Sequence, residues 1–162
     1  MYIKRRLNDK HTVYKTLRVK HVRSQELSHR YTATVGIGGN LGDVKRRFEH
    51  LFVEIKRDKR VTLVTTSLIL KNPPFGYTDQ DDFFNSIILI RTSMTSKIFL
   101  DYLLRLEKKF GRKRSFENAP RTLDLDIIFF DNIVMNTPTL TLPHAAWHER
   151  ESVLIPLASL VS

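Results

Sequence analysis

The chain has no cysteine and no long apolar run. Without cysteine it cannot have a disulfide scaffold, a thiolate nucleophile, or a zinc or iron–sulfur site with thiolate ligands. A membrane-spanning helix needs about 20 consecutive apolar residues, so we expect no such helix and no membrane partner. With 162 residues, the chain is long enough for one domain with a hydrophobic core but short for two.

Acidic residues are few compared with basic ones, at 17 Asp and Glu against 27 Lys and Arg, and the formal net charge is +10. This is typical of proteins that bind nucleic acids, acidic membranes or phosphate-bearing ligands. Residues 1–31 hold nine basic and two acidic residues, whereas the rest hold 18 and 15. We therefore predict a basic N-terminal extension over residues 1–30 and a single domain over residues 31–162. The polarity of the extension favours a solvated or surface-packed segment, with a short edge strand at residues 17–20 as the alternative.

Hydrophobic periodicity in the domain alternates between that of strands and that of helices. The predicted strands are residues 31–37, 61–70, 83–91 and 123–130, and the predicted helices follow Asp43 and Ser96 as N-caps. This β-α-β-β-α-β order predicts an α+β, ferredoxin-like fold with helices packed on one face of an antiparallel sheet. Residues 138–143 and 151–160 would add C-terminal elements.

Residues 38–42, Gly-Gly-Asn-Leu-Gly, are too rich in glycine for a regular element, so we predict a loop. This loop either approaches a ligand closely or makes a tight turn from strand to helix. Neither the P-loop motif nor a complete Gly-x-Gly-x-x-Gly motif is present, so the sequence identifies no standard nucleotide site.

Two aspartates lie two residues apart in the predicted strand 123–130. Asp124 and Asp126 point to the same face because side chains alternate in a strand, and Leu125 points to the other. Adjacent carboxylates repel unless a cation lies between them, and Mg²⁺ favours carboxylates together with phosphate oxygens. The alternative is a solvent-exposed strand face with two surface aspartates.

Basic residues precede this strand, with Arg112, Lys113 and Arg114 in a polar segment and Arg121 at the start of the strand. Arg binds phosphate as a planar fork and Lys as a point charge. Carboxylates for a metal and bases for phosphate so close together indicate a nucleoside triphosphate and a transfer of phosphoryl type. A charged surface loop without a ligand is the alternative.

A third group combines aromatic and amide side chains. Phe83 and Asn85 share one strand face, and a ring that stacks beside an amide that reads an edge suits a flat heterocycle. Asn72, Pro73 and Phe75 lie in the preceding loop. The alternative is that Phe83 belongs to the core and Asn85 is structural.

His144 follows Pro143, and His148 comes four residues later. No third ligand lies at a familiar spacing, so the pair does not indicate a zinc site. Donation of a hydrogen bond from His144 to a phosphate is the functional interpretation, and a structural histidine is the alternative.

Several segments, in order, resemble the 6-hydroxymethyl-7,8-dihydropterin pyrophosphokinase family of folate biosynthesis. The most specific is Arg121-Thr122-Leu123-Asp124-Leu125-Asp126. The others are Gly36–Gly42, Asn72–Gly76, Asp79-Gln80 with Phe83–Asn85, Glu107 with Phe110–Arg112, and Pro143-His144 with His148–Arg150. The resemblance extends over residues 35–157, which is most of the chain.

The resemblance implies transfer of the β,γ-pyrophosphoryl group of ATP to the hydroxyl of the pterin, with release of AMP. It implies two Mg²⁺ ions on Asp124 and Asp126, and catalysis by these residues with Arg112 and Arg121. The implied ATP-binding residues are Glu107, Arg112, Arg114, Arg121, Ile127, Thr141, His144 and Arg150. The implied pterin-binding residues are Asn72, Pro73, Phe75, Phe83 and Asn85. We expect ATP and the pterin as partners, no nucleic acid, and a monomer in the cytoplasm.

The sequence departs from the family at several positions, one of which is Ala145 after His144, where a Pro or Tyr is typical. Relatives usually have an aromatic residue at the position of Ser152, where it stacks on the pterin opposite Phe83. Asn118 stands where the polar loop often has an aromatic or basic residue. These departures leave a catalytically degenerate relative as one alternative function. The basic extension leaves a nucleic-acid-binding domain as another, although the sequence has no evident aromatic motif for a sheet that binds RNA.

Overall fold

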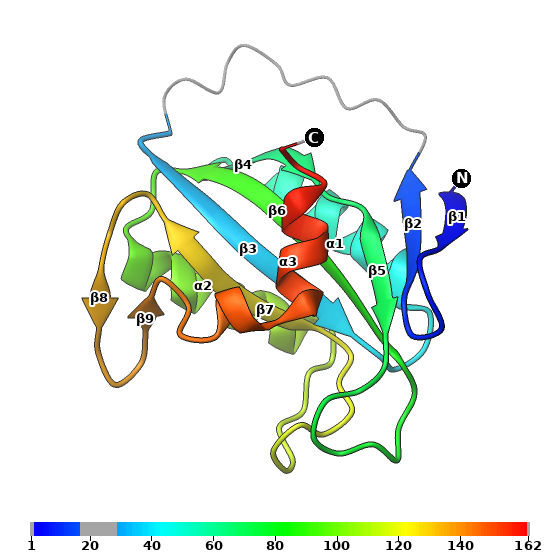
Figure 1. Cartoon of the computed structure of the whole chain (residues 1–162). Coiled ribbons are helices and arrows are strands. Elements are labelled where there is room, and N and C mark those ends of the chain that lie inside the picture. The colour runs from blue at the N-terminus through cyan, green and yellow to red at the C-terminus, as the bar shows by residue number, and fades with distance from the viewer. Residues whose placement is uncertain (1, 17–28, 162) are drawn as a thin grey trace.

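The computed structural model describes residues 2–16 and 29–161, and these ranges form one large antiparallel sheet, a two-stranded ribbon and three α-helices (Figure 1). The predicted α+β class is therefore confirmed. None of the helices in the described ranges is long and apolar enough to cross a membrane. The strands are β1 Tyr2–Arg6, β2 Thr12–Thr16, β3 Tyr31–Gly39, β4 Val61–Thr66, β5 Ile69–Asn72, β6 Phe83–Thr92, β7 Asp124–Phe130, β8 Met135–Asn136 and β9 Thr141–Leu142. The helices are α1 Val44–Arg57, α2 Ser96–Lys109 and α3 Glu151–Ala158, with a short 3-10 helix η2 at Trp147–Glu149.

Strands β3 and β6 form the centre of the large sheet. Strand β3 pairs with β6 and β7, and β6 also pairs with β4 and β5. The prediction of a single strand over residues 61–70 is wrong, because the chain is divided at Ser67. The Ser67 N–H donates to the Ile87 carbonyl (2.7 Å), and Ser67 Oγ accepts the Ile87 N–H (2.7 Å). A side chain thus replaces one ladder hydrogen bond, and two short strands share one edge of β6.

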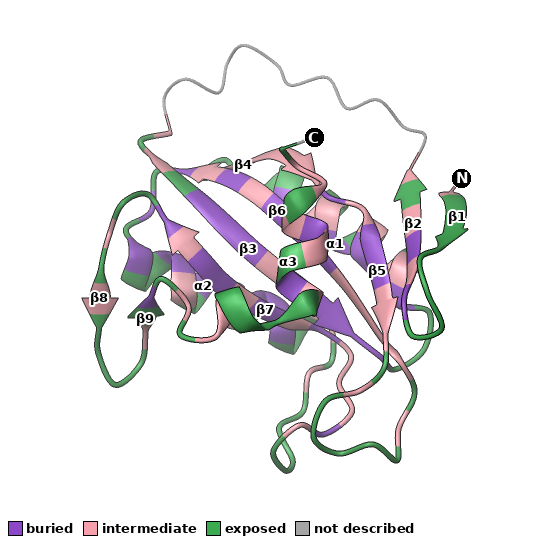
Figure 2. Cartoon of the chain, in the orientation of Figure 1, coloured by how far each residue is buried: buried purple, intermediate pink, exposed green. Residues whose placement is uncertain are grey.

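Helices α1 and α2 cover one face of the sheet, and α3 lies on the other (Figure 1). Asp43 caps α1 as predicted, because its carboxylate accepts the Arg46 N–H (3.1 Å). The buried residues of α1 recur at helical spacing and enter the main core, namely Val44, Phe48, Leu51 and Ile55. A smaller cluster lies under α3, where Val153 packs with Ile87 and Ile128. Figure 2 shows buried residues concentrated in strands β3, β6 and β7.

Helix α2 differs from its prediction by one residue at its start. Thr95 is the N-cap, and Ser96 is the first helical residue. The helix ends at Lys109, and Gly111, the predicted stop, has a φ of +81°, which glycine adopts without steric strain.

The glycine-rich stretch continues strand β3 rather than forming a loop at once. Gly38 pairs with Asn85 and Asp124, and Gly39 pairs with Phe84, so the prediction of a loop from residue 38 is wrong at these two positions. A Cβ on Gly39 would lie 2.5 Å from the Thr122 carbonyl oxygen. Glycine is therefore required here by the close approach of two backbones.

Residues 2–16 form two strands that the sequence analysis does not predict. Strands β1 and β2 make an antiparallel hairpin, and β2 pairs with β5, so the large sheet extends into this basic segment (Figure 1). Val13 is buried, whereas most of β1 is exposed. The alternative strand at residues 17–20 lies outside the described residues.

We expect Gly39→Ala to lower the free energy of unfolding by about 1–3 kcal/mol, since the new methyl group overlaps the Thr122 carbonyl and two backbones must separate. Urea denaturation measures this change. Gly36→Ala is the matched control in the same strand, because its Cβ would lie at ordinary contact distances, 3.4 Å from the flexible Ile128 side chain and 3.8 Å from the Asp126 carbonyl oxygen. Equal stability of the two variants would contradict the requirement for close approach.

Candidate functional site

A cavity of about 490 Å³ opens on the sheet face that carries α3. It brings together nine residues predicted from the sequence, which are Asn72, Pro73, Phe75, Phe83, Asn85, Arg121, Asp124, Asp126 and Arg150. Predicted residues that do not line it are Glu107, Arg112, Arg114, Ile127, Thr141 and His144. Gly36 and Gly38 of strand β3 also line the cavity. The glycine stretch is thus both a close backbone contact and part of the cavity wall.

Strand β7 presents Asp124 and Asp126 to the cavity, as its predicted alternation requires. Leu125 and Ile127 point the other way and are 4% exposed in the main core. The side chain of Ile127 therefore does not line the cavity. The core therefore fixes the direction of both aspartates.

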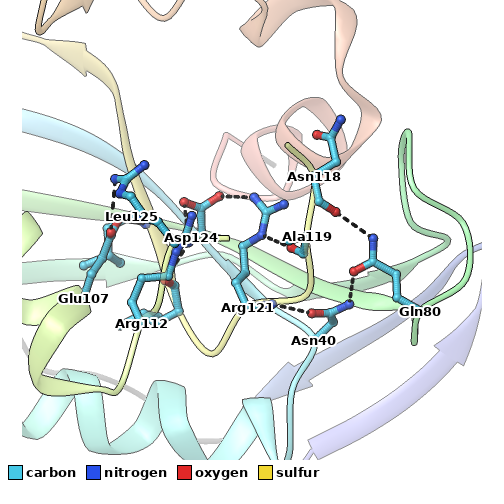
Figure 3. A network of polar contacts seen from close by, with 11 residues as sticks. Asn40, Gln80, Glu107, Arg112, Asn118, Ala119, Arg121, Asp124 and Leu125 are labelled. Atoms are coloured by element: carbon cyan, nitrogen blue, oxygen red, sulfur yellow. Dashed lines mark hydrogen bonds and ion pairs between the residues drawn. The ribbon is translucent and has the colours of Figure 1, made fainter. Parts of the chain in front are cut away.

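Asp124 is held by two arginines. Arg112 Nη1 lies 3.1 Å from one carboxylate oxygen, and Arg121 Nη1 lies 3.1 Å from the other (Figure 3). Both guanidinium groups are anchored to the backbone as well, Arg112 to the Leu123 carbonyl and Arg121 to the Ala119 carbonyl. Two cations thus offset the charge of Asp124, although only Arg121 reaches the cavity.

Asp126 has no such partner among the hydrogen bonds of the described residues. Burial, and after it the nearby charges of Asp124 and Glu107, raise the pKa of Asp126 to about 7, although the charges of Arg150 and Arg121 act in the opposite direction. The site therefore carries a carboxylate that becomes charged only near neutral pH in the absence of a cation.

Glu107 supports the strand from helix α2. It is 3% exposed, and its Oε1 accepts the Leu125 N–H (2.9 Å), while Oε2 lies 3.8 Å from Arg114 Nη2. Burial raises the pKa of Glu107, and the Leu125 hydrogen bond partly opposes this. This carboxylate lies behind β7, on the side away from the cavity lining.

A polar network joins three loops at the rim of the cavity (Figure 3). Asn40 is 4% exposed, and its Oδ1 accepts the Arg121 N–H (2.9 Å) while its Nδ2 donates to Gln80 Oε1 (2.8 Å). Gln80 Nε2 in turn donates to the Asn118 carbonyl (2.8 Å). The sequence analysis assigned no role to Asn40; a polar residue directly after a glycine-rich strand end was the available signal.

The amide pair of the cavity is preorganised. Asn85 Nδ2 donates to Asn72 Oδ1 (2.7 Å), and Asn85 Oδ1 lies where a Cβ on Gly38 would approach to 2.6 Å. Phe83 lines the same wall, and the Arg121 guanidinium carbon lies 5.2 Å from the centre of its ring. Phe75 is 80% exposed at the entrance. These side chains offer a ring and an amide edge side by side.

His144 and Thr141 follow β7 through the β8–β9 ribbon. The His144 N–H donates to the Ile128 carbonyl (2.9 Å), and its Nδ1 accepts the Ala146 N–H (3.2 Å), which places the ring hydrogen on Nε2. Burial lowers the pKa of His144, and the charge of Arg150 lowers it further. Thr141 is exposed on β9. A neutral His144 can therefore donate one hydrogen bond from Nε2.

Residues that the sequence analysis did not assign also line the cavity. They include Lys10 and His11 from the β1–β2 hairpin, and Glu151 and Val153 from α3. Ser152, the position where relatives usually have an aromatic residue, lines the cavity as well. No sequence signal pointed to the hairpin residues, because only the sheet pairing brings them to the cavity.

Comparisons with known proteins match most of the chain to one family. Residues 34–162 match the model of the 7,8-dihydro-6-hydroxymethylpterin-pyrophosphokinase family. The chain is 42% identical over 133 residues to the 2-amino-4-hydroxy-6-hydroxymethyldihydropteridine pyrophosphokinase of Campylobacter jejuni, which covers 82% of this chain and 85% of that protein. It is 41% identical to the enzyme of the same name from Helicobacter pylori, over 76% of this chain and 77% of the relative. For the Bacillus subtilis enzyme of that name the identity is 34%, over 79% and 77%.

We expect Asp126→Asn to stabilise the metal-free chain at pH 8 by on the order of 2 kcal/mol. Since the pKa of Asp126 is raised to about 7, the folded wild-type chain binds more protons than the unfolded chain between about pH 4 and pH 7. Its free energy of unfolding therefore falls as the pH rises through this window, and the variant lacks that fall. Urea denaturation at several pH values with EDTA measures both. Asp101→Asn, at an exposed carboxylate of α2, is the control, and an equal pH dependence in Asp126→Asn and wild type would contradict the assignment.

Proposed function

Because the chain belongs to the 7,8-dihydro-6-hydroxymethylpterin-pyrophosphokinase family, we propose that the cavity is its active site, with Asp124 and Asp126 as ligands of two Mg²⁺ ions. The reaction transfers pyrophosphate from ATP to the hydroxyl of 6-hydroxymethyl-7,8-dihydropterin in folate biosynthesis, and AMP leaves. The observation that carries the assignment is the meeting of two carboxylates of β7 with a ring and an amide pair in one cavity.

The two carboxylates fit a hard divalent cation. Burial and neighbouring negative charge raise the pKa of Asp126, and a bound cation would relieve both effects. In the described ranges, no group of three His, Cys, Asp or Glu side chains could hold a metal. Mg²⁺ suits a site of two carboxylates because it commonly keeps waters and binds substrate phosphates. When bound, it supplies charge neutralisation on the phosphates and lowers the pKa of the attacking hydroxyl.

The arginines supply the complementary charge. Arg121 lines the cavity and pairs with Asp124, so it lies between the carboxylates and the ring of Phe83. Each guanidinium has five N–H donors, and those not used by Asp124 and the backbone are available to phosphate oxygens. Arg112 would orient Asp124 from behind. The preorganised donors stabilise the charge that develops on the transferred group.

Other predicted residues surround the nucleotide in this proposal. His144 donates from Nε2 to a phosphate, and Arg150 adds a positive charge at the cavity wall. Arg114 belongs to the polar loop 112–120, which joins the Asn40–Gln80 network through Asn118 and covers ATP when closed. Thr141, exposed on β9, is the remaining ATP contact that we propose. Glu107 and Ile127 would support the nucleotide site through strand β7, because their side chains are buried on the side away from the cavity.

The pterin occupies the part of the cavity with the amide pair. Asn85 and Asn72 present both donor and acceptor atoms in a fixed arrangement, which suits the alternating edge of a pterin. Phe83 stacks on the ring, and Pro73 and Phe75 border the entrance.

We also propose the finer features of the fold and setting. The strand order β4-β6-β3-β7, with two crossover helices on one face, supports a ferredoxin-like core over residues 31–162. We also propose that the chain acts as a monomer in the cytoplasm, where ATP is available.

The proposed function is tested by mixing the chain with ATP, Mg²⁺ and 6-hydroxymethyl-7,8-dihydropterin and separating the nucleotides. We expect AMP, with no ADP, and only when all components are present. Release of ADP would indicate an ordinary kinase. Absence of both products would favour a degenerate relative.

We expect Asp124→Asn and Asp126→Asn each to lower kcat by about 100-fold or more, since each removes a charged oxygen donor from the proposed metal site. The rate of AMP formation at saturating substrates measures the loss. Asp101→Asn on α2 is the control and should retain wild-type kcat. Wild-type kcat in either cavity variant would contradict the metal assignment.

A further inference from the structure

We propose that His11, at the end of the β1–β2 hairpin, forms part of the substrate site and contacts the flat ring of the pterin. This inference rests on the proposed function of the cavity. It concerns a segment that lies outside the family match, which begins at residue 34.

Sheet pairing carries His11 to the pterin end of the cavity. Thr12 of β2 pairs with Lys71 of β5, so continuing the register by one residue places His11 beside Asn72. Asn72 in turn pairs with Phe83 of β6. His11, Asn72 and Phe83 therefore lie in one row across three neighbouring strands, and all three line the cavity.

The imidazole of His11 is held firmly in this position. It is 7% exposed, and its Nδ1 lies 3.0 Å from Asn8 Oδ1 while its Nε2 lies 3.0 Å from Glu151 Oε2. Asn8 Oδ1 also accepts the backbone N–H groups of Lys10 and His11, both at 2.9 Å, so the hairpin loop is tied together around the ring. Glu151 belongs to α3, so the same ring joins the hairpin to the helix on this face of the sheet.

The protein partners of the two ring nitrogens limit which part of His11 can contact a ligand. Because both ring nitrogens have protein partners, the surface left for the cavity is the flat carbon face and edge. Among the residues that line the cavity, the rings are those of His11, Phe83 and Phe75, and Phe75 is 80% exposed at the entrance. The neighbouring Ser152 of α3 contributes no ring. His11 thus supplies ring surface on a wall that otherwise has none, and flat heterocycles bind well against such surfaces.

The test separates ring contact from hydrogen bonding by comparing three substitutions. We expect His11→Ala to raise the KM for 6-hydroxymethyl-7,8-dihydropterin about tenfold, with the KM for ATP changed less than twofold. His11→Phe keeps a ring without the nitrogens and should restore the KM to within about threefold of wild type. His11→Gln keeps a polar group without a ring and should resemble His11→Ala. Lys15→Ala, at an exposed residue of the same hairpin, is the control with wild-type constants.

Each outcome decides the proposal. Rescue by Gln instead of Phe, or equal increases in both KM values, would show that His11 only holds the hairpin in place and would overturn it. An unchanged pterin KM in His11→Ala would also overturn it, while AMP production by the wild type would leave the proposed function intact. A wild-type chain that makes no AMP would overturn both. If His11→Ala fails to fold, the Phe and Gln variants, which fill most or all of the space of the imidazole, decide by the same comparison.

Discussion

The close approach of strand β3 to the chain that enters β7 is the constraint on which the site depends. Gly39 passes so near the Thr122 carbonyl that any Cβ would overlap it, and Asn40 then fixes the Arg121 backbone N–H. Arg121 and Asp124 are close neighbours of Thr122 in the chain, so this contact sets their positions as well. The close contact of the two backbones, which only glycine allows, therefore holds the charged groups in fixed positions.

Of the two aspartates at the cavity, one is paired with positive charges and the other is not. Asp124 has two guanidinium partners, whereas Asp126, two residues along the same strand face, has burial and like charge around it. A protein interior tolerates such a carboxylate only as a protonated group or beside a cation. The instability of Asp126 as an isolated anion is thus the physical basis for ligand and metal capture in the proposed reaction.

The N-terminal hairpin β1–β2 contributes to the wall of the cavity. Strand β2 adds to β5 through backbone hydrogen bonds, and the loop before it reaches α3 through His11 and Glu151. The helix on the open face and the hairpin at the sheet edge therefore support each other beside the cavity. A basic segment that first indicated polyanion binding is, over residues 2–16, a structural part of the sheet.

The sequence by itself determined the elements whose cause is local. Alternation in residues 123–130 predicted that Asp124 and Asp126 share a face, and the helical spacing of Val44 and Phe48 predicted α1, because periodicity alone decides which side of an element is apolar. Only the tertiary structure decided the strand character of Gly38 and Gly39, the break at Ser67, and the arrival of His11 at the cavity. These features depend on contacts between segments far apart in the chain, and such contacts leave no periodic signal in the sequence.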